Sequence, residues 1–131
     1  MLERNEYLES IRKGSFGETN STTSQEELFQ NNCLRPILKF QNDLFIHFFI
    51  SYAKRNKGVF FKLSLENKNK YIEKAIQSDI VFRNQLIGLI VGLFTIDEFK
   101  EYIKNSSDFN KRIVAMLVER WKSQLQLLNE N

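Results

Sequence analysis

The sequence predicts an all-α fold, a small bundle of about five helices preceded by a short N-terminal helix. Apolar residues recur every three or four positions over most of the chain, the spacing that places them on one face of an α-helix. No segment alternates strictly between apolar and polar residues over more than a few positions. One proline and five glycines in 131 residues leave few of the turns that a many-stranded fold requires.

A polar segment near the N-terminus divides the chain. Residues 2–13, LERNEYLESIRK, predict a short helix, whereas residues 14–24, GSFGETNSTTS, show no apolar periodicity and are typical of a linker. We therefore expect a flexible N-terminal arm and linker over residues 1–24. Residues 25–131 are then one helical-bundle domain, which is long enough to enclose a hydrophobic core.

Capping residues indicate where the first helices of the bundle begin and end. Ser24 and Glu27 have the spacing of a capping box that opens the helix QEELFQNN. Pro36 suits a first helical turn, where its missing N–H costs nothing, so the next helix is expected over residues 36–56. Gly58 suits a left-handed C-terminal cap for that helix.

The remaining helices follow from similar signals. Ser64 is expected to cap a helix over residues 64–77, and a fourth helix covers residues 79–94. Thr95 and Glu98 form a second capping box, which starts IDEFKEYIKN. Ser106 or Ser107 is expected to cap the final helix, at about 108–128. The short connections predict antiparallel packing of neighbouring helices.

The helix expected over residues 36–56 contains the chain's one histidine, His47. At about 100° per residue, one stripe of this helix is apolar: Ile37, Leu38, Phe45, Phe48, Phe49 and Tyr52. The opposite side is polar: Lys39, Asp43, His47, Ser51 and Lys54. His47 is therefore expected on the solvent face, paired with Asp43 one turn away.

Catalytic and metal sites are not expected at His47. Asp43, His47 and Ser51 have the residue types of a hydrolytic triad, but at this spacing on one helix the serine points alongside the imidazole rather than toward it. No G-x-S-x-G turn occurs in the chain. Zinc needs three or four converging ligands, and the sequence offers one His and one Cys, so it predicts no catalytic residue, cofactor or metal site.

Three observations bear on cellular location. The longest wholly apolar run, LIGLIVGLF (86–94), falls well short of the about 20 residues that cross a bilayer. The N-terminus MLERNEYLES lacks the apolar core of a signal peptide, and the single Cys33 can form no internal disulfide. We therefore expect a cytoplasmic protein without a membrane-spanning segment.

The helix over residues 79–94 has more apolar surface than one face can bury. Its apolar residues cover more than half of its circumference: Ile80, Phe82, Leu86, Ile87, Leu89, Ile90, Leu93 and Phe94. Gly88 and Gly92, four residues apart, would let another helix approach closely. Such a helix is either central in the bundle or shared with a second subunit.

Several polar residues fall on apolar helix faces, among them Gln41, Asn110, Gln124 and Arg83. Buried amides and guanidinium groups must be hydrogen-bonded. One interpretation is a network between helices that fixes their register, with Asp79 pairing with Arg83. The other is a small polar pocket for an anion or small ligand, lined by Gln41, Asp43, Arg83, Asn84 and Asn110.

Charge is unevenly distributed along the chain. Residues 1–33 contain three Lys or Arg and six Glu, a net charge of −3, and residues 34–131 contain 16 basic and 10 acidic residues, a net charge of +6. The basic body could bind an anionic partner such as a nucleic acid, or the acidic arm could lie against it. The cations alternate with acids and no recognition-helix motif occurs, so nucleic-acid binding is an alternative rather than the leading interpretation.

Three stretches of the sequence resemble a family: LRPILKFQND (34–43), FRNQLIGLIVGLFT (82–95) and YIKNSSDFNKRI (102–113). It is a family of short bacterial proteins of about this length that often carry the automatic label "glyoxalase". The likeness extends from about Leu28 to Leu128. The label implies a lyase built from paired βαβββ modules with a metal held by His and Glu, and no residue of such a site has a counterpart at any position here.

These observations predict a non-enzymatic helical bundle that acts through association, as a homodimer or with a protein partner. Binding of nucleic acid or another anionic ligand by the basic body is the first alternative. A glyoxalase-type lyase, as the family label implies, is the second.

Overall fold

The computed structural model describes residues 2–12 and 24–130, and within these ranges it is helical with no β-strand, which confirms the all-α prediction. The described residues form more helices than the about five predicted, because segments expected as single helices are divided. The α-helices are α1 (Leu2–Ile11), α2 (Gln25–Phe29), α3 (Arg35–Phe40), α4 (Asn42–Arg55), α5 (Leu65–Ser78), α6 (Ile80–Val91), α7 (Ile96–Ile103) and α8 (Ser106–Ser123). A π-helix (Gln30–Leu34) joins α2 to α3, and 3-10 turns cover Val59–Lys62 and Leu125–Leu127. The linker expected over residues 14–24 lies outside the described residues except for Ser24.

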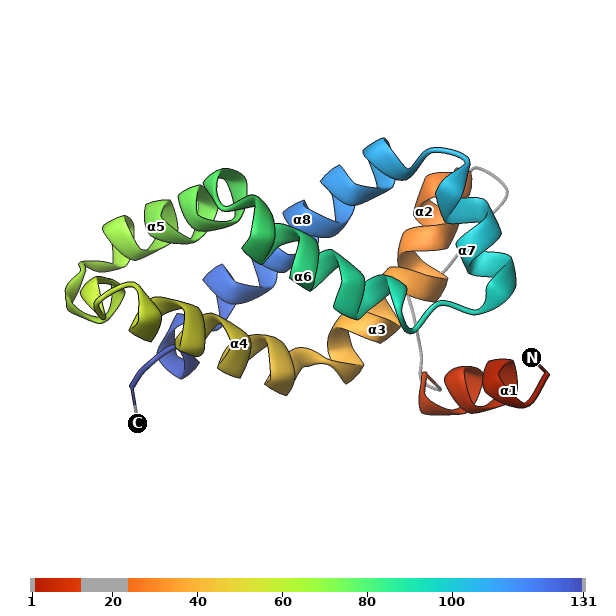
Figure 1. Cartoon of the computed structure of the whole chain (residues 1–131), viewed down its shortest axis with the longest axis horizontal. Coiled ribbons are helices and arrows are strands. Elements are labelled where there is room, and N and C mark those ends of the chain that lie inside the picture. Colours follow the sequence, from red (N-terminus) through yellow and green to blue (C-terminus); the bar gives the residue numbers. More distant parts are fainter. Residues whose placement is uncertain (1, 13–23, 131) are drawn as a thin grey trace.

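The helices are arranged around α6 and α8. Figure 1 shows α6 lying across the front of the bundle with α8 behind it, and α5 packs against both. α4 and α5 lie toward one end of the molecule, and α2 and α7 lie at the other. α1 is placed at this second end, beside the segment that connects α6 to α7.

Pro36 lies in the first turn of α3, as the sequence predicts, but α3 continues a helical run that starts upstream at Gln25. The backbone is helical from Gln25 to Phe40, and the π-turn before Pro36 pairs the N–H of Arg35 with the carbonyl of Gln30. A proline inside an α-helix leaves one carbonyl without its N–H partner, and its ring crowds the preceding turn. The wider π-turn is a local adjustment that accommodates both effects.

The helix expected over residues 36–56 is broken at Gln41. This residue has φ −91° and ψ 5°, which ends α3 and starts α4 in a new direction. The predicted apolar stripe nevertheless faces the core on both sides of the break. Ile37, Leu38, Phe45, Phe49 and Tyr52 are buried, and the predicted polar side is exposed.

Most of the predicted caps are confirmed. The hydroxyls of Ser24 and Ser64 accept from the backbone N–H groups three residues on, at 3.1 and 3.3 Å. Thr95 and Glu98 form the complete capping box that opens α7. Gly58 adopts the left-handed conformation, with φ 66°.

The two ends of the final helix were predicted wrongly. α8 begins at Ser106 after Asn105, so neither Ser106 nor Ser107 occupies the cap position. α8 ends at Ser123 rather than near 128, and a 3-10 turn follows it. α6 likewise ends at Val91, three residues before the predicted end.

The core is rich in aromatic rings from different helices. Phe49 lies 5.1 Å from Trp121, and Phe82 is stacked on Trp121 at 6.0 Å between ring centroids. Trp121 is buried and donates from Nε1 to the carbonyl oxygen of Phe45 at 3.1 Å. This cluster joins α4, α6 and α8, so the position of each helix depends on the other two.

Candidate functional site

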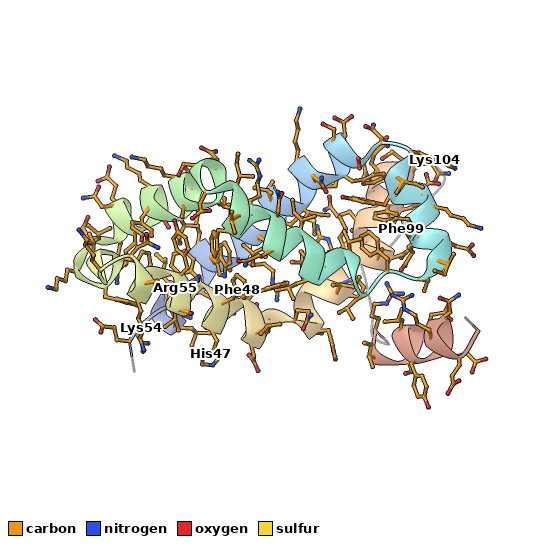
Figure 2. All side chains as sticks on the ribbon, in the orientation of Figure 1. His47, Phe48, Lys54, Arg55, Phe99 and Lys104 are labelled. Carbon is orange, nitrogen blue, oxygen red and sulfur yellow. The ribbon has the colours of Figure 1, made fainter. Side chains whose placement is uncertain are left out.

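His47 lies on the solvent-exposed side of α4 and points away from the bundle (Figure 2). Asp43 and Ser51 are also exposed. Within the described part of the chain, no hydrogen bond or ion pair joins His47 to Asp43, so the predicted surface pair is not formed. Among the described residues, His47 belongs to no group of three or more His, Cys, Asp or Glu that could hold a metal ion.

The five residues of the predicted polar pocket come from three helices and the α3–α4 break. Asp43 and Asn84 are exposed, and Gln41 and Arg83 are half-buried. The Asn110 amide oxygen accepts from the Tyr102 hydroxyl at 2.6 Å. No hydrogen bond or ion pair joins any two of the five. Their role as a ligand site stays a prediction.

Asp79 caps α6 instead of pairing with Arg83. Its Oδ1 accepts from the backbone N–H of Phe82 at 3.0 Å, and the two side chains form no ion pair. The predicted local pair is therefore wrong. A carboxylate at this position stabilises the exposed N–H groups of the first turn, which explains why it is held there.

A groove of the described structure lies elsewhere, between the α2–α3 run and α8. It has a volume of about 950 Å³. Its charged lining residues are Glu26, Arg35, Glu101, Lys104, Asp108, Lys111, Arg112, Glu119 and Arg120, and Leu38, Phe109, Ala115 and Met116 add apolar surface. None of the five residues predicted from the sequence lines it.

Arg120 is held in this groove by an amide pair that joins α4 to the end of α8. Its Nε donates to Oδ1 of Asn42 at 3.2 Å. Asn42 and Gln124 exchange two hydrogen bonds, of 2.8 and 2.9 Å. Burial lowers the pKa of the Arg120 guanidinium, because a partly dehydrated site disfavours its charge. Gln124 was identified from the sequence as a polar residue on an apolar face, whereas Asn42 was not.

Neither Arg112 nor Arg120 is among the five pocket residues predicted from the sequence. Arg112, Met116 and Arg120 are four residues apart, so they lie one above the other on α8. That spacing was the available signal. The spacing alone does not indicate a binding groove, because the sequence does not show that α3 lies opposite this side of α8.

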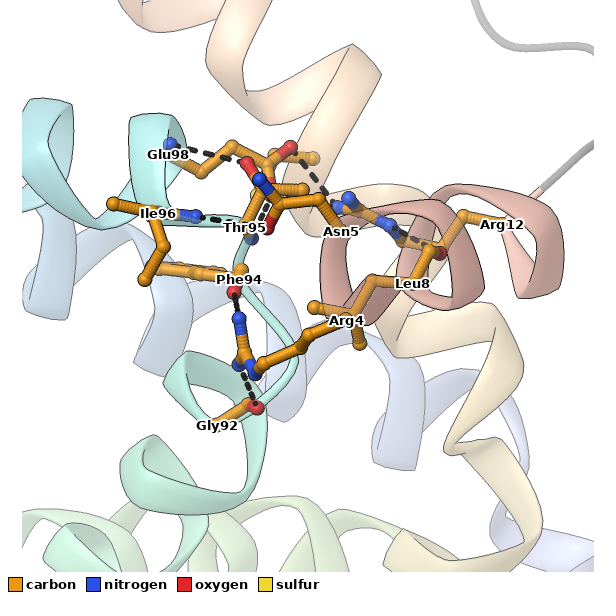
Figure 3. A network of polar contacts seen from close by, with 10 residues as sticks. Arg4, Asn5, Leu8, Arg12, Gly92, Phe94, Thr95, Ile96 and Glu98 are labelled. Atoms are coloured by element: carbon orange, nitrogen blue, oxygen red, sulfur yellow. Dashed lines mark hydrogen bonds and ion pairs between the residues drawn. The ribbon is translucent and has the colours of Figure 1, made fainter. Parts of the chain in front are cut away.

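α1 is fastened to the start of α7 (Figure 3). Arg12 donates from Nη1 to both carboxylate oxygens of Glu98, and Arg4 donates to the carbonyl oxygens of Phe94 and Gly92 at 2.8 and 2.9 Å. The backbone N–H of Ile96 donates to Oδ1 of Asn5 at 3.3 Å. The N-terminal helix therefore lies against the body, but the contacts come from its arginines and an asparagine rather than from the acidic side chains that the interpretation of its charge invoked.

A second surface feature is the outward side of α6, which we call the α6 face: Ile80, Val81, Asn84, Gln85 and Gly88. All five residues are exposed and uncharged. Ile80 and Val81 are 59% and 68% exposed. A Cβ added at Gly88 would meet no atom within 4 Å, so the surface above it is open. No described helix uses the predicted close approach at this glycine.

No group of three or more His, Cys, Asp or Glu residues in the described ranges could hold a metal ion. No described helix is long and apolar enough to cross a membrane. In comparisons with known proteins, no protein-family model, no curated protein and no solved structure matches the chain.

Proposed function

We propose that the protein is a non-enzymatic helical module that acts by self-association, and that the α6 face is the contact surface. The observation that carries this proposal is that the outward side of α6 has no charged residue and exposes two large apolar side chains. The inward residues Phe82, Leu86, Ile87 and Ile90 are buried in the core. Ile80 and Val81 add large apolar side chains on the opposite, exposed side.

On α6 the residue Arg83 is the one charged side chain, and it is half-buried beside the α6 face rather than part of it. Surface helices usually keep charged residues outward, because charges favour solvation and oppose association. The outward side of α6 lacks this protection.

The α6 face suits a symmetric contact between two copies. In a two-fold dimer the same patch meets itself, so a charged centre would bring like charges together. The α6 face has none, and Gly88 would let the two helices approach closely. The patch is small compared with the about 800 Å² per partner of a typical stable interface, so we expect a dimer that dissociates on dilution.

Sedimentation velocity over a range of concentrations tests the proposal. We expect the wild-type chain to shift from monomer to dimer as concentration rises. Gly88→Arg should keep it monomeric, because it places a charge at the centre of the α6 face. Nothing within 4 Å obstructs a new Cβ there, and glycine is about 1 kcal/mol less favourable than arginine inside a helix, so the fold should be retained.

Leu65→Arg is the matched control. Leu65 is an apolar residue on α5 that is 69% exposed, and it lies outside the α6 face. This variant should dimerise like the wild type. A wild-type chain that stays monomeric at every concentration, or equal dimerisation of the Gly88→Arg variant, would contradict the proposal.

A further inference from the structure

The groove beside α8 contains two half-buried arginines that lack an acidic partner. Arg112 and Arg120 both line it, and neither forms an ion pair with any described residue. None of their unpartnered nitrogens is among the buried polar atoms of the described residues, so these nitrogens are open to solvent in the groove. An external anion can therefore contact both guanidinium groups without displacing an acidic side chain.

Both arginines are oriented by neutral groups. Arg112 donates from Nη1 to the Gln30 side-chain oxygen, and Arg120 donates from Nε to Asn42. An amide oxygen positions a guanidinium without neutralising its charge. Nη2 of Arg112 and both Nη atoms of Arg120 have no hydrogen-bond partner within the described residues, and paired donors of this kind match a carboxylate or phosphate group.

Part of the surface between the two arginines is apolar. Met116 lies midway between them on α8, and Leu38 and Phe109 also line the groove. The helix rise places the α-carbons of Arg112 and Arg120 roughly 12 Å apart along the axis. The volume of about 950 Å³ is that of a site for an organic molecule.

The rim of the groove has both charges: Arg35, Lys104 and Lys111 are exposed there, and acidic residues lie among them. Glu26, Asp108 and Glu119 line it and are exposed. A polyanion such as a nucleic acid would bring phosphates close to these carboxylates. A smaller ligand with its charges at its ends avoids them.

We propose that this groove binds an extended organic dianion, with a carboxylate or phosphate at each end of an apolar middle. Arg112 holds one end and Arg120 the other, and the middle lies on Met116. This site is separate from the α6 face and does not depend on self-association.

Isothermal titration of the full chain with succinate, suberate and dodecanedioate tests the length requirement. Suberate or dodecanedioate should bind more tightly than succinate, which is too short to reach both arginines. Dodecanediol, which has the same apolar chain without charges, should bind at least about tenfold more weakly than dodecanedioate. Inorganic phosphate should bind weakly, because one anionic group can reach only one guanidinium.

Arg112→Gln and Arg120→Gln should each weaken binding of the preferred dicarboxylate by about tenfold or more, as expected for loss of a charge-assisted contact. Lys100→Gln is the charge-matched control, because Lys100 is exposed on α7 outside the groove, and it should leave affinity unchanged. Circular dichroism checks that each variant folds. If Arg120→Gln does not fold, the affinities of the single variants Arg112→Gln and Met116→Glu for the dicarboxylate test the proposal instead.

Three results would overturn the proposal. The first is the absence of binding of any of the dicarboxylates to the wild-type chain at millimolar concentration. The second is unchanged affinity in folded Arg112→Gln. The third is binding of dodecanediol or inorganic phosphate as tightly as that of the best dicarboxylate, which would show that the two-ended recognition is absent.

Discussion

Arg12 donates from Nη1 to both carboxylate oxygens of Glu98, at 2.9 and 3.0 Å, across 86 residues of sequence. The same carboxylate accepts the backbone N–H of Thr95 at 2.8 Å and completes the capping box of α7. Arg12 is only 8% exposed, and its Nε donates to the carbonyl oxygen of Leu8. One glutamate therefore starts α7 and also holds the end of α1 against it.

Replacing Glu98 with Ala should release α1 from the body. The change leaves the Arg12 guanidinium buried without a counter-charge, which costs up to about 3–5 kcal/mol if the arginine stays in place. Undocking of α1 relieves this cost, so α1 amides should exchange hydrogen much faster while the core helices stay protected. Lys104→Met removes an exposed pair with Glu101 and should change stability by less than about 1 kcal/mol. Unchanged protection of α1 in the Glu98→Ala variant would contradict the assigned role.

Alkaline pH should destabilise the protein through Cys33. Burial, reinforced by the negative charge of Glu98, raises the pKa of this thiol well above its ordinary value of 9.0. The folded state thus keeps a proton that the unfolded state loses. Stability is full below pH 9 and falls above it, by up to about 1.4 kcal/mol per pH unit from this group.

Urea unfolding between pH 8 and 11 measures this loss. Burial also raises the pKa of Tyr52 and Tyr71, so these residues add to the slope. Cys33→Ala removes the thiol and should reduce the alkaline slope without abolishing it. If the free energy of unfolding of Cys33→Ala falls with pH as steeply as that of the wild type, the Cys33 thiol ionises equally in the folded and unfolded states.

Thr95→Ala should destabilise the protein by about 1 kcal/mol, because the N-terminus of α7 loses the hydroxyl that accepts from the N–H of Glu98. Ser106→Ala is the matched control. Ser106 has the sequence signature of a cap but lies inside α8, so its loss should cost less than about 0.5 kcal/mol. Thermal or urea unfolding of the two variants compares them directly, and equal costs would contradict the assigned caps.

Two substitutions in the turn after α4 should have different effects on the free energy of unfolding. Lys57 and Gly58 both have positive φ, at 70° and 66°. Gly58→Ala should destabilise the protein by about 1–2 kcal/mol, because a Cβ is strained in this conformation. Lys57→Gly removes the same strain from the folded state but raises the conformational entropy of the unfolded state. The two effects oppose each other, so the protein should be stabilised by up to about 1 kcal/mol or change little in stability. Urea or thermal unfolding compares the midpoints of the two variants. Equal shifts in the same direction for Gly58→Ala and Lys57→Gly would show that backbone strain does not control the stability of this turn.

Elements set by local chemistry were predictable from the sequence. The capping box of α7, the serine cap of α5 and the left-handed Gly58 each depend on residues within four positions of one another. The apolar stripes of α4 and α8 were predictable for the same reason, since periodicity is a local property.

Elements set by contacts between distant helices were not predictable. Gln41 carries no helix-breaking signal, and its φ and ψ suit most residue types. Pro36 follows a π-turn, which the sequence does not distinguish from the start of a helix. Arg112 and Arg120 became candidates for a binding site only because α3 faces them across the groove.

The proposed contact between two copies is tested most directly by cross-linking at its centre. A two-fold pairing of the α6 face places Gly88 of one copy close to Gly88 of the other. Cys33 is buried and remains a thiol, so a new cysteine at the surface is the reactive one. Gly88→Cys should form a disulfide-linked dimer rapidly under mild oxidation, and Leu65→Cys, exposed on α5, should form it much more slowly. Equal rates for the two variants, or a Gly88→Cys chain that stays monomeric, would contradict self-association through α6.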